Sequence, residues 1–214
     1  MSSLPETLVN GQSFVFNAPG HEELWERLAS QDPAQTAGRA AGQWLGGHDF
    51  LIELMNVKYL FKTGQRLIVG PNSRLAPDRR VALSLLNYLV GARETTLSGR
   101  LVPETVLPGG DRFFSGTHAL ARQAILNAYG SNGALFLEKA GRLGAEAAAC
   151  ESGSFSCRLL LLPKIAAQIT LCEDDEEFPA ELYFAFDASA ADHVPLAIIS
   201  ALVGLFNDQM AAWQ

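Results

Sequence analysis

The sequence predicts an α+β fold in which two antiparallel β-meanders are separated by a helical segment and followed by a buried C-terminal helix. Apolar, β-tolerant runs fall in two blocks rather than alternating strictly with helices, which favours α+β over a doubly wound sheet. Short turns join the runs within each block, and such turns connect only adjacent antiparallel strands. The chain then ends in a long apolar stretch with helical periodicity.

Two helices are predicted near the N-terminus. His21 to Gln31 has an amphipathic pattern, with Leu24 and Leu28 one turn apart on the side that we expect to pack on the main body. Residues 33–47 combine alanines with four glycines. That composition predicts a weak helix that breaks into a loop.

The first meander is predicted between Phe50 and Val69. Its turns are expected at Asn56 and at Thr63-Gly64-Gln65, where the apolar pattern is interrupted. The three predicted strands are Phe50–Leu54, Lys58–Lys62 and Arg66–Val69.

A helical segment is predicted between the two meanders. Pro77 and Asp78 are typical of a first helical turn, and Gly91 is expected to end that helix. An extended stretch, Leu101–Leu107, follows it. Two further helices are then expected, each followed by a glycine that favours a left-handed C-cap, over Thr117–Tyr129 and Gly133–Leu143.

The second meander and the final helix complete the predicted fold. The strands are expected at Phe155–Leu162, Ile165–Cys172 and Glu181–Phe186, and the helix at about 194–213. One face of that helix is apolar at alternating steps of three and four residues, which predicts deep burial. The face comprises Leu196, Ile199, Val203, Phe206, Met210 and Trp213.

Length, composition and charge limit the class of protein. The chain has 214 residues, of which 48% are hydrophobic, so a folded core is expected rather than disorder. We expect one domain over residues 1–214, with residues 1–19 as a loosely ordered N-terminal arm. The net charge of −7, without a stripe of Lys and Arg, argues against nucleic acid as a partner, because neutralising phosphates supplies most of that affinity.

The compartment is inferred from the termini and the cysteines. The N-terminus has neither the basic nor the apolar region of a secretory signal. The apolar stretch 194–206 is shorter than the roughly 20 residues that cross a bilayer, so no membrane partner is expected. The sequence therefore predicts a cytoplasmic protein. The cysteines match neither a disulfide framework nor a CxxC motif, so free thiols are expected at Cys150, Cys157 and Cys172.

The stretch from Leu107 to His118 is the most suggestive for binding. The common nucleotide, zinc-protease and hydrolase motifs are absent from the chain, whereas here a glycine-rich turn and two aromatic residues precede a histidine. We expect Phe113, Phe114 and His118 to line a ligand pocket, with His118 in the first turn of a helix. The competing interpretation is a capping or core histidine that is hydrogen-bonded to a carbonyl.

A metal site is the second hypothesis. Glu176 lies in the acidic run 173–177, and His193 follows Asp187 closely, so these side chains could converge with His118. The competing interpretations are a solvated acidic turn and an N-cap at Asp192 for the last helix. Nothing in the spacing decides between them.

Several segments, in their order along the chain, resemble a family of bacterial and archaeal domains of unknown function. They are Thr36–Ala41, Leu85–Leu89, Leu107–Gly110, Phe114–Gly116, Leu162–Pro163, Asp175–Pro179 and Phe186–Asp187. The resemblance covers roughly residues 20 to 212. Such domains are frequent in anaerobes such as sulfate reducers and are sometimes joined to iron–sulfur modules. The resemblance implies an anaerobic cytoplasm as the setting, and it implies no reaction.

Three functions remain open at this stage. The first is a non-catalytic domain that binds a small molecule or a cofactor of unknown identity beside Phe113, Phe114 and His118. The second is a metal-assisted hydrolase or lyase that uses His118, Asp187, His193 and Glu176. The third is a module that only binds a protein partner.

Overall fold

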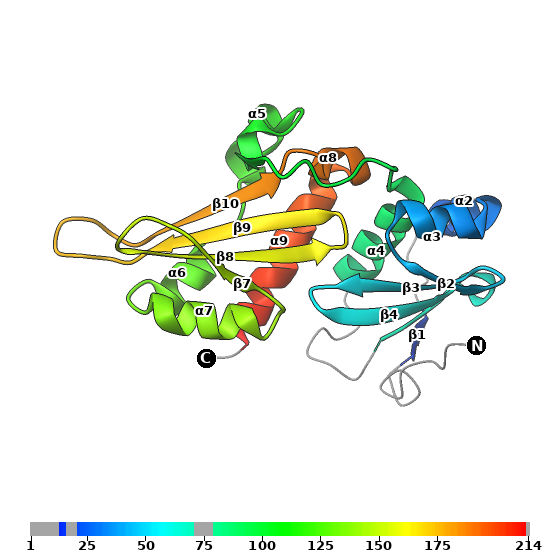
Figure 1. The fold of residues 1–214 in the computed structure, drawn as a ribbon, viewed down its shortest axis with the longest axis horizontal. Coiled ribbons are helices and arrows are strands. Elements are labelled where there is room, and N and C mark those ends of the chain that lie inside the picture. The colour runs from blue at the N-terminus through cyan, green and yellow to red at the C-terminus, as the bar shows by residue number, and fades with distance from the viewer. Residues whose placement is uncertain (1–12, 16–20, 71–78, 213–214) are drawn as a thin grey trace.

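The computed structural model describes residues 13–15, 21–70 and 79–212, and it confirms the predicted α+β fold (Figure 1). The first sheet contains β1 (Ser13–Val15), β2 (Gln43–Gly46), β3 (Asp49–Leu54), β4 (Val57–Lys62) and β5 (Leu67–Val69). Its strand order is β1-β5-β4-β3-β2, and all neighbours are antiparallel. The predicted meander is therefore present and gains a strand at each edge.

The second sheet is the second meander with two added strands. It contains β6 (Leu101–Pro103), β7 (Glu146–Ala148), β8 (Ser154–Leu162), β9 (Ile165–Cys172) and β10 (Glu181–Asp187). The order is β6-β10-β9-β8-β7, again fully antiparallel. Alternate residues of β9 are buried, so one face of this sheet belongs to the core.

Helices cover the sheets (Figure 1). Beside the first sheet lie α2 (Glu22–Ser30), α3 (Pro33–Arg39) and α4 (Arg79–Gly91). The core face of the second sheet is covered by α6 (Gln123–Tyr129), α7 (Gly133–Gly141) and α9 (Leu196–Ala211). Short helical turns fill the connections: α5 (Gly110–Phe113), α8 (Ala190–His193), η1 (Thr63–Gln65), η2 (Glu104–Val106) and η3 (Gly116–His118).

The last helix is buried, as predicted. Ile199, Phe206 and Met210 have no exposed surface, because α9 packs against α4 and α6. Tyr129 Oη donates to the Met210 carbonyl at 2.6 Å and fixes α6 on it. Among the described residues, none of the helices combines the length and the apolar character needed to span a bilayer.

The two sheets meet at the turn between β3 and β4. Met55 and Asn56 adopt positive φ angles there, and the Met55 N–H donates to the Leu161 carbonyl of β8 at 3.2 Å. The register of β8 with β9 shifts between Leu160 and Leu162, and Leu161 is the residue in between. A single hydrophobic cluster contains buried residues from both sheets, so the core is continuous across this junction.

Several predicted boundaries are wrong. Helix α6 begins at Gln123 rather than Thr117. The carbonyls of Leu120 and Ala121, which would accept backbone N–H groups in a helix that began at Thr117, instead accept hydrogen bonds from Arg122 Nη1 and Asn207 Nδ2. Asp192 lies inside α8, and Pro195 occupies the N-cap position of α9.

Three short strands, β1, β2 and β7, were not predicted, and part of the prediction lies beyond the described residues. Strands β2 and β7 are edge strands with largely exposed residues, so they carry no apolar alternation. Trp213 and most of the expected N-terminal arm, 1–12 and 16–19, fall outside the described residues, whereas 13–15 form β1.

Candidate functional site

A pocket of about 380 Å³ lies where the β3–β4 turn meets the second sheet. Strand β3 contributes Glu53 and the turn contributes Asn56. Leu97 and Gly99 come from the segment that precedes β6, and Leu101 is the first residue of β6. The second sheet contributes Arg158, Leu160 and Ala166 from its open face, defined as the face opposite α6, α7 and α9. The remaining lining residues are Leu143, Gly144, Glu146, Leu159 and Asp187.

The rim of the pocket is a close approach of two turns. Gly144, at φ +85°, follows α7 and lies against Asn56. A Cβ at Gly144 would stand 2.9 Å from the Asn56 Cβ, so only glycine fits without a shift of the turn. The pocket is therefore formed by chain segments whose positions are constrained by the fold.

Two leucines give the pocket an accessible apolar surface. Leu160 is 49% exposed and Leu97 is 40% exposed, although both are large hydrophobic residues. Leu160 lies opposite Ala166 in the β8–β9 register, and the small side chain of Ala166 leaves a depression in the sheet surface beside Leu160. Exposed apolar surface gathered in a concavity is typical of a binding site.

Arg158 supplies the pocket with a cation held in place. Its Nε donates to Gln168 Oε1 of β9 at 2.9 Å, which orients the guanidinium on the open face. Glu146 lies opposite Arg158 in the β7–β8 register, yet no ion pair joins Arg158 to any described carboxylate. The terminal nitrogens of this guanidinium thus make no hydrogen bond within the described part of the chain.

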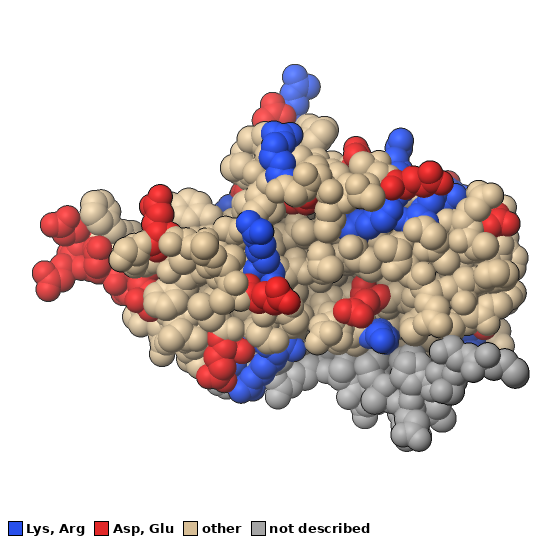
Figure 2. Space-filling model, in the orientation of Figure 1, with Lys and Arg blue, Asp and Glu red and all other residues tan. Residues whose placement is uncertain are grey.

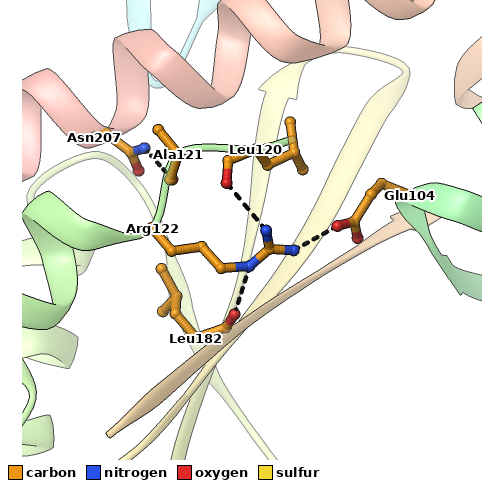
Figure 3. A network of polar contacts seen from close by, with 6 residues as sticks. All are labelled: Glu104, Leu120, Ala121, Arg122, Leu182 and Asn207. Atoms are coloured by element: carbon orange, nitrogen blue, oxygen red, sulfur yellow. Dashed lines mark hydrogen bonds and ion pairs between the residues drawn. The ribbon is translucent and has the colours of Figure 1, made fainter. Parts of the chain in front are cut away.

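Arg122 provides the contrast, because each of the three nitrogens of its guanidinium donates a hydrogen bond within the protein (Figure 3). Its Nε donates to Leu182 O at 2.8 Å, its Nη1 to Leu120 O at 3.0 Å and its Nη2 to the Glu104 carboxylate. The group also lies 5.6 Å from the centre of the Phe184 ring. Arg122 therefore clamps α6 to β10 and η2, and it offers nothing to a ligand.

Charged side chains flank the junction of the two sheets rather than cover it. Figure 2 shows a largely uncharged strip between the open face of the second sheet and the β3–β4 turn, with charged side chains on both sides. A separate acidic cluster lies at the tip of the β9–β10 connection, where residues 173–177 are found. The acidic loop is thus remote from the pocket.

Asp187 fixes the wall of the pocket that precedes β6. Its carboxylate accepts hydrogen bonds from the N–H and Oγ of Ser98, the N–H of Gly99, and the N–H and Oγ of Ser189, at 2.6 to 3.0 Å. Burial opposes ionisation, but the bonds from Ser189 and Ser98 dominate and hold the pKa of Asp187 well below its usual range. The residue is thus an ionised anchor for the loop.

His193 lies behind that wall in a buried polar chain. Its Nδ1 accepts the Arg93 N–H at 3.2 Å, and Lys164 Nζ donates to the Arg93 carbonyl at 2.7 Å. Burial and the nearby Lys164 charge lower the pKa of His193, so the ring is neutral at pH 7. The proton then belongs to Nε2, which is buried and has no partner among the described residues.

The residues expected to bind a ligand form a different cluster. Phe113 contacts both Phe114 and His118, with ring centres 5.0 and 4.9 Å apart. Phe114 is buried, whereas His118 is exposed in η3 rather than placed in the first turn of a helix. None of the three lines the pocket at the sheet junction.

The expected metal ligands are distributed over separate elements. His118 is in η3, Glu176 is exposed in the β9–β10 connection, and Asp187 and His193 are committed to backbone N–H groups. Among the residues that the structure describes, no three His, Cys, Asp or Glu side chains form a group that could hold a metal ion. The structure does not bring the four predicted ligands together.

Of the pocket residues, sequence reasoning singled out only Asp187, and as a metal ligand; it missed the others, although one signal was available. Arg158 interrupts an apolar run that continues through four leucines, 159–162. In a strand these leucines cannot all point to the core, since side chains alternate between faces. Leu160 must therefore share the open face with Arg158. The approach of the β3–β4 turn, however, depends on tertiary packing.

Comparison with known proteins gives a family and no activity. A family model described as a domain of unknown function (DUF3786) matches residues 32–208, which include strands β3, β4 and β8 at the junction of the two sheets and the whole pocket lining. No curated protein and no solved structure matches the chain.

Proposed function

The chain belongs to the DUF3786 family, and we propose that it is a non-catalytic domain that binds a small molecule or cofactor in the pocket between the β3–β4 turn and the second sheet. One observation carries the proposal: two exposed leucines, Leu97 and Leu160, share a concavity of about 380 Å³ with an arginine whose terminal nitrogens are unused. Small-molecule sites combine mostly apolar walls with a few placed polar groups in this way.

The proposed binding site does not include Phe113, Phe114 and His118, the residues that the sequence predicted. Phe113 contacts Phe114 and His118, Phe114 belongs to the core and Phe113 packs against it, whereas the junction pocket offers accessible apolar surface. The non-catalytic part is supported by the state of Asp187, which lines the pocket, and of His193 behind it, the two predicted catalytic groups in this region. The Asp187 carboxylate accepts five hydrogen bonds from donors of the protein, and His193 is buried behind this wall of the pocket. Neither is placed to exchange a proton with a ligand.

The setting is a further part of the proposal. The resemblance to domains of anaerobes supports an accessory role in anaerobic cytoplasm, beside a protein partner. The net charge of −7 opposes a nucleic-acid partner. An absorption spectrum and metal analysis of protein purified without oxygen test this part. A coloured band or a stoichiometric metal would identify a cofactor, and a metal held through His118, Asp187, His193 and Glu176 would favour the hydrolase alternative.

Occupancy of the pocket is tested with a neutral apolar probe, N-phenyl-1-naphthylamine, whose fluorescence rises when it enters an apolar site. Ala166 lines the pocket from β9, so Ala166→Phe would fill it. Ala185→Phe is the matched control, because Ala185 lies on the same open face in β10 and does not line the pocket. We expect the probe to bind the original protein and the control but not Ala166→Phe. Equal binding by all three, or by none, would reject the site.

A further inference from the structure

We propose that the ligand of this pocket is a small organic monoanion with an apolar body, and that Arg158 binds its anionic group. The inference rests on the proposed function, since it assigns a ligand class to the same pocket. Its first support is the state of the guanidinium. Gln168 fixes Nε at 2.9 Å and leaves both terminal nitrogens without a bond in the described residues. A guanidinium oriented in this way suits a carboxylate, sulfonate or phosphate oxygen pair.

The other charges of the pocket restrict where an anion can bind. Glu53 lines the pocket from β3 and Glu146 from β7, and both are exposed carboxylates. The Asp187 carboxylate is already surrounded by donors of the protein. Among the described residues that line the pocket, Arg158 is thus the one cation that attracts a ligand anion, and a second negative charge would meet Glu53 or Glu146. This arrangement selects one anionic group and disfavours a dianion.

The apolar body of the ligand is assigned to the leucines. Leu160 lies two residues after Arg158 on the same strand face, and Leu97 lines the same pocket from the segment that Asp187 anchors. An anion on Arg158 thus leaves the rest of the molecule on apolar surface. A volume of about 380 Å³ is at the small end of ligand pockets, which limits the body to a few rings or a short chain.

Two probes that differ by one charge test the inference. 8-Anilinonaphthalene-1-sulfonate is the sulfonated counterpart of N-phenyl-1-naphthylamine, so comparing them isolates the contribution of the anion. We expect Arg158→Gln to weaken binding of the sulfonate roughly tenfold or more and to change binding of the neutral probe by less than about twofold. Arg112→Gln removes the same charge from an exposed arginine of α5 and should change neither.

The outcomes separate the two proposals. If neither probe binds the original protein, or if Ala166→Phe leaves both bound, the pocket itself is rejected. If both probes occupy the pocket but Arg158→Gln affects them equally or not at all, the pocket stands and the role of Arg158 is overturned. Melting temperatures of all variants are measured alongside, and Arg158→Lys gives a second, charge-conserving variant. That variant should bind the sulfonate more tightly than Arg158→Gln but less tightly than the original protein, since it keeps the charge and loses the paired donors.

Discussion

The N–H of Met55 donates to the carbonyl of Leu161, 3.2 Å away, and thereby joins the turn of one sheet to the bulged strand of the other. Met55 and Leu161 are both buried members of a hydrophobic cluster that contains residues of both sheets. The two sheets thus share one core, and the pocket lies on the outside of their junction. Its shape depends on their relative position.

We expect residues 1–214 to unfold in one cooperative transition, as one domain. A continuous core couples the two sheets, so neither can lose its packing without exposing apolar surface of the other. Urea unfolding followed by far-ultraviolet circular dichroism and by tryptophan fluorescence should give coincident curves. The described tryptophans, Trp25 and Trp44, lie near the first sheet, whereas the dichroism reports both sheets. Two separated transitions would show that the sheets are independent domains.

Replacing Asp187 by Asn should destabilise the protein by roughly 2 to 4 kcal/mol. The carboxylate accepts hydrogen bonds from N–H and hydroxyl groups, whereas the amide NH2 of Asn is a donor and cannot accept them. The wall formed by Ser98 and Gly99 would lose its anchor. Chemical denaturation measures the loss. Asp192→Asn, at an exposed aspartate of α8, should stay within about 0.5 kcal/mol. Equal stability of the two variants would contradict the anchoring role.

The fold could be predicted from the sequence further than the site could. Apolar alternation and glycine-bounded runs identified both meanders, and the buried face of α9 was correct at Ile199, Phe206 and Met210. Edge strands β2 and β7 escaped because exposed residues carry no such pattern.

The pocket depends on contacts between segments that are far apart in the sequence. Asn56 lies against Gly144, and Leu97 and Leu160 line the same pocket, although no local periodicity of the sequence relates the members of either pair. The glycines and aromatics before His118 resembled a binding loop, but their rings pack on one another in a short helical connection. Local composition indicated a turn there and carried no information about what the turn approaches.

The stability of the protein should decline as the pH falls below about 6.5, the usual pKa of histidine in an unfolded chain. In the folded protein the pKa of His193 is lowered by burial and by Lys164 and Arg93, against the opposing effect of Asp192 and Asp187. The unfolded chain therefore takes up a proton first, and this favours unfolding. Above 6.5 both states are neutral at this position and the contribution is complete.

Urea midpoints between pH 5 and 8 test this dependence. His193→Asn cannot titrate in that range, so its midpoint should vary less between pH 5 and 7 than that of the original protein. His118→Asn is the matched control, because His118 is exposed and should leave the slope unchanged. If the urea midpoint of His193→Asn varied with pH as steeply as that of the original protein, groups other than His193 would be responsible for the loss of stability in acid.

Truncating the core face of α9 should be costly. Ile199→Ala and Phe206→Ala each remove a side chain with no exposed surface, and losses of roughly 2 to 5 kcal/mol are expected from the cavities that result. Ala197→Gln, at an exposed position of the same helix, should change the free energy of unfolding by less than about 0.5 kcal/mol. A cost near the surface value for Phe206→Ala would contradict the burial of this helix.

The three cysteines should be free thiols of graded reactivity. Cys150 is exposed, Cys172 is half-buried beside Ser154, and Cys157 is buried. Burial raises the pKa of the Cys157 thiol to about 12, so almost none of it is thiolate at neutral pH, and the thiolate is the form that attacks a disulfide reagent. Titration with a chromogenic disulfide should find Cys150 fast, Cys172 slower and Cys157 unreactive until urea is added. Under denaturing, non-reducing conditions all three should react, and Cys150→Ser should remove the fast phase alone. A denatured count below three would reveal a disulfide, which would also contradict the cytoplasmic setting of the proposal.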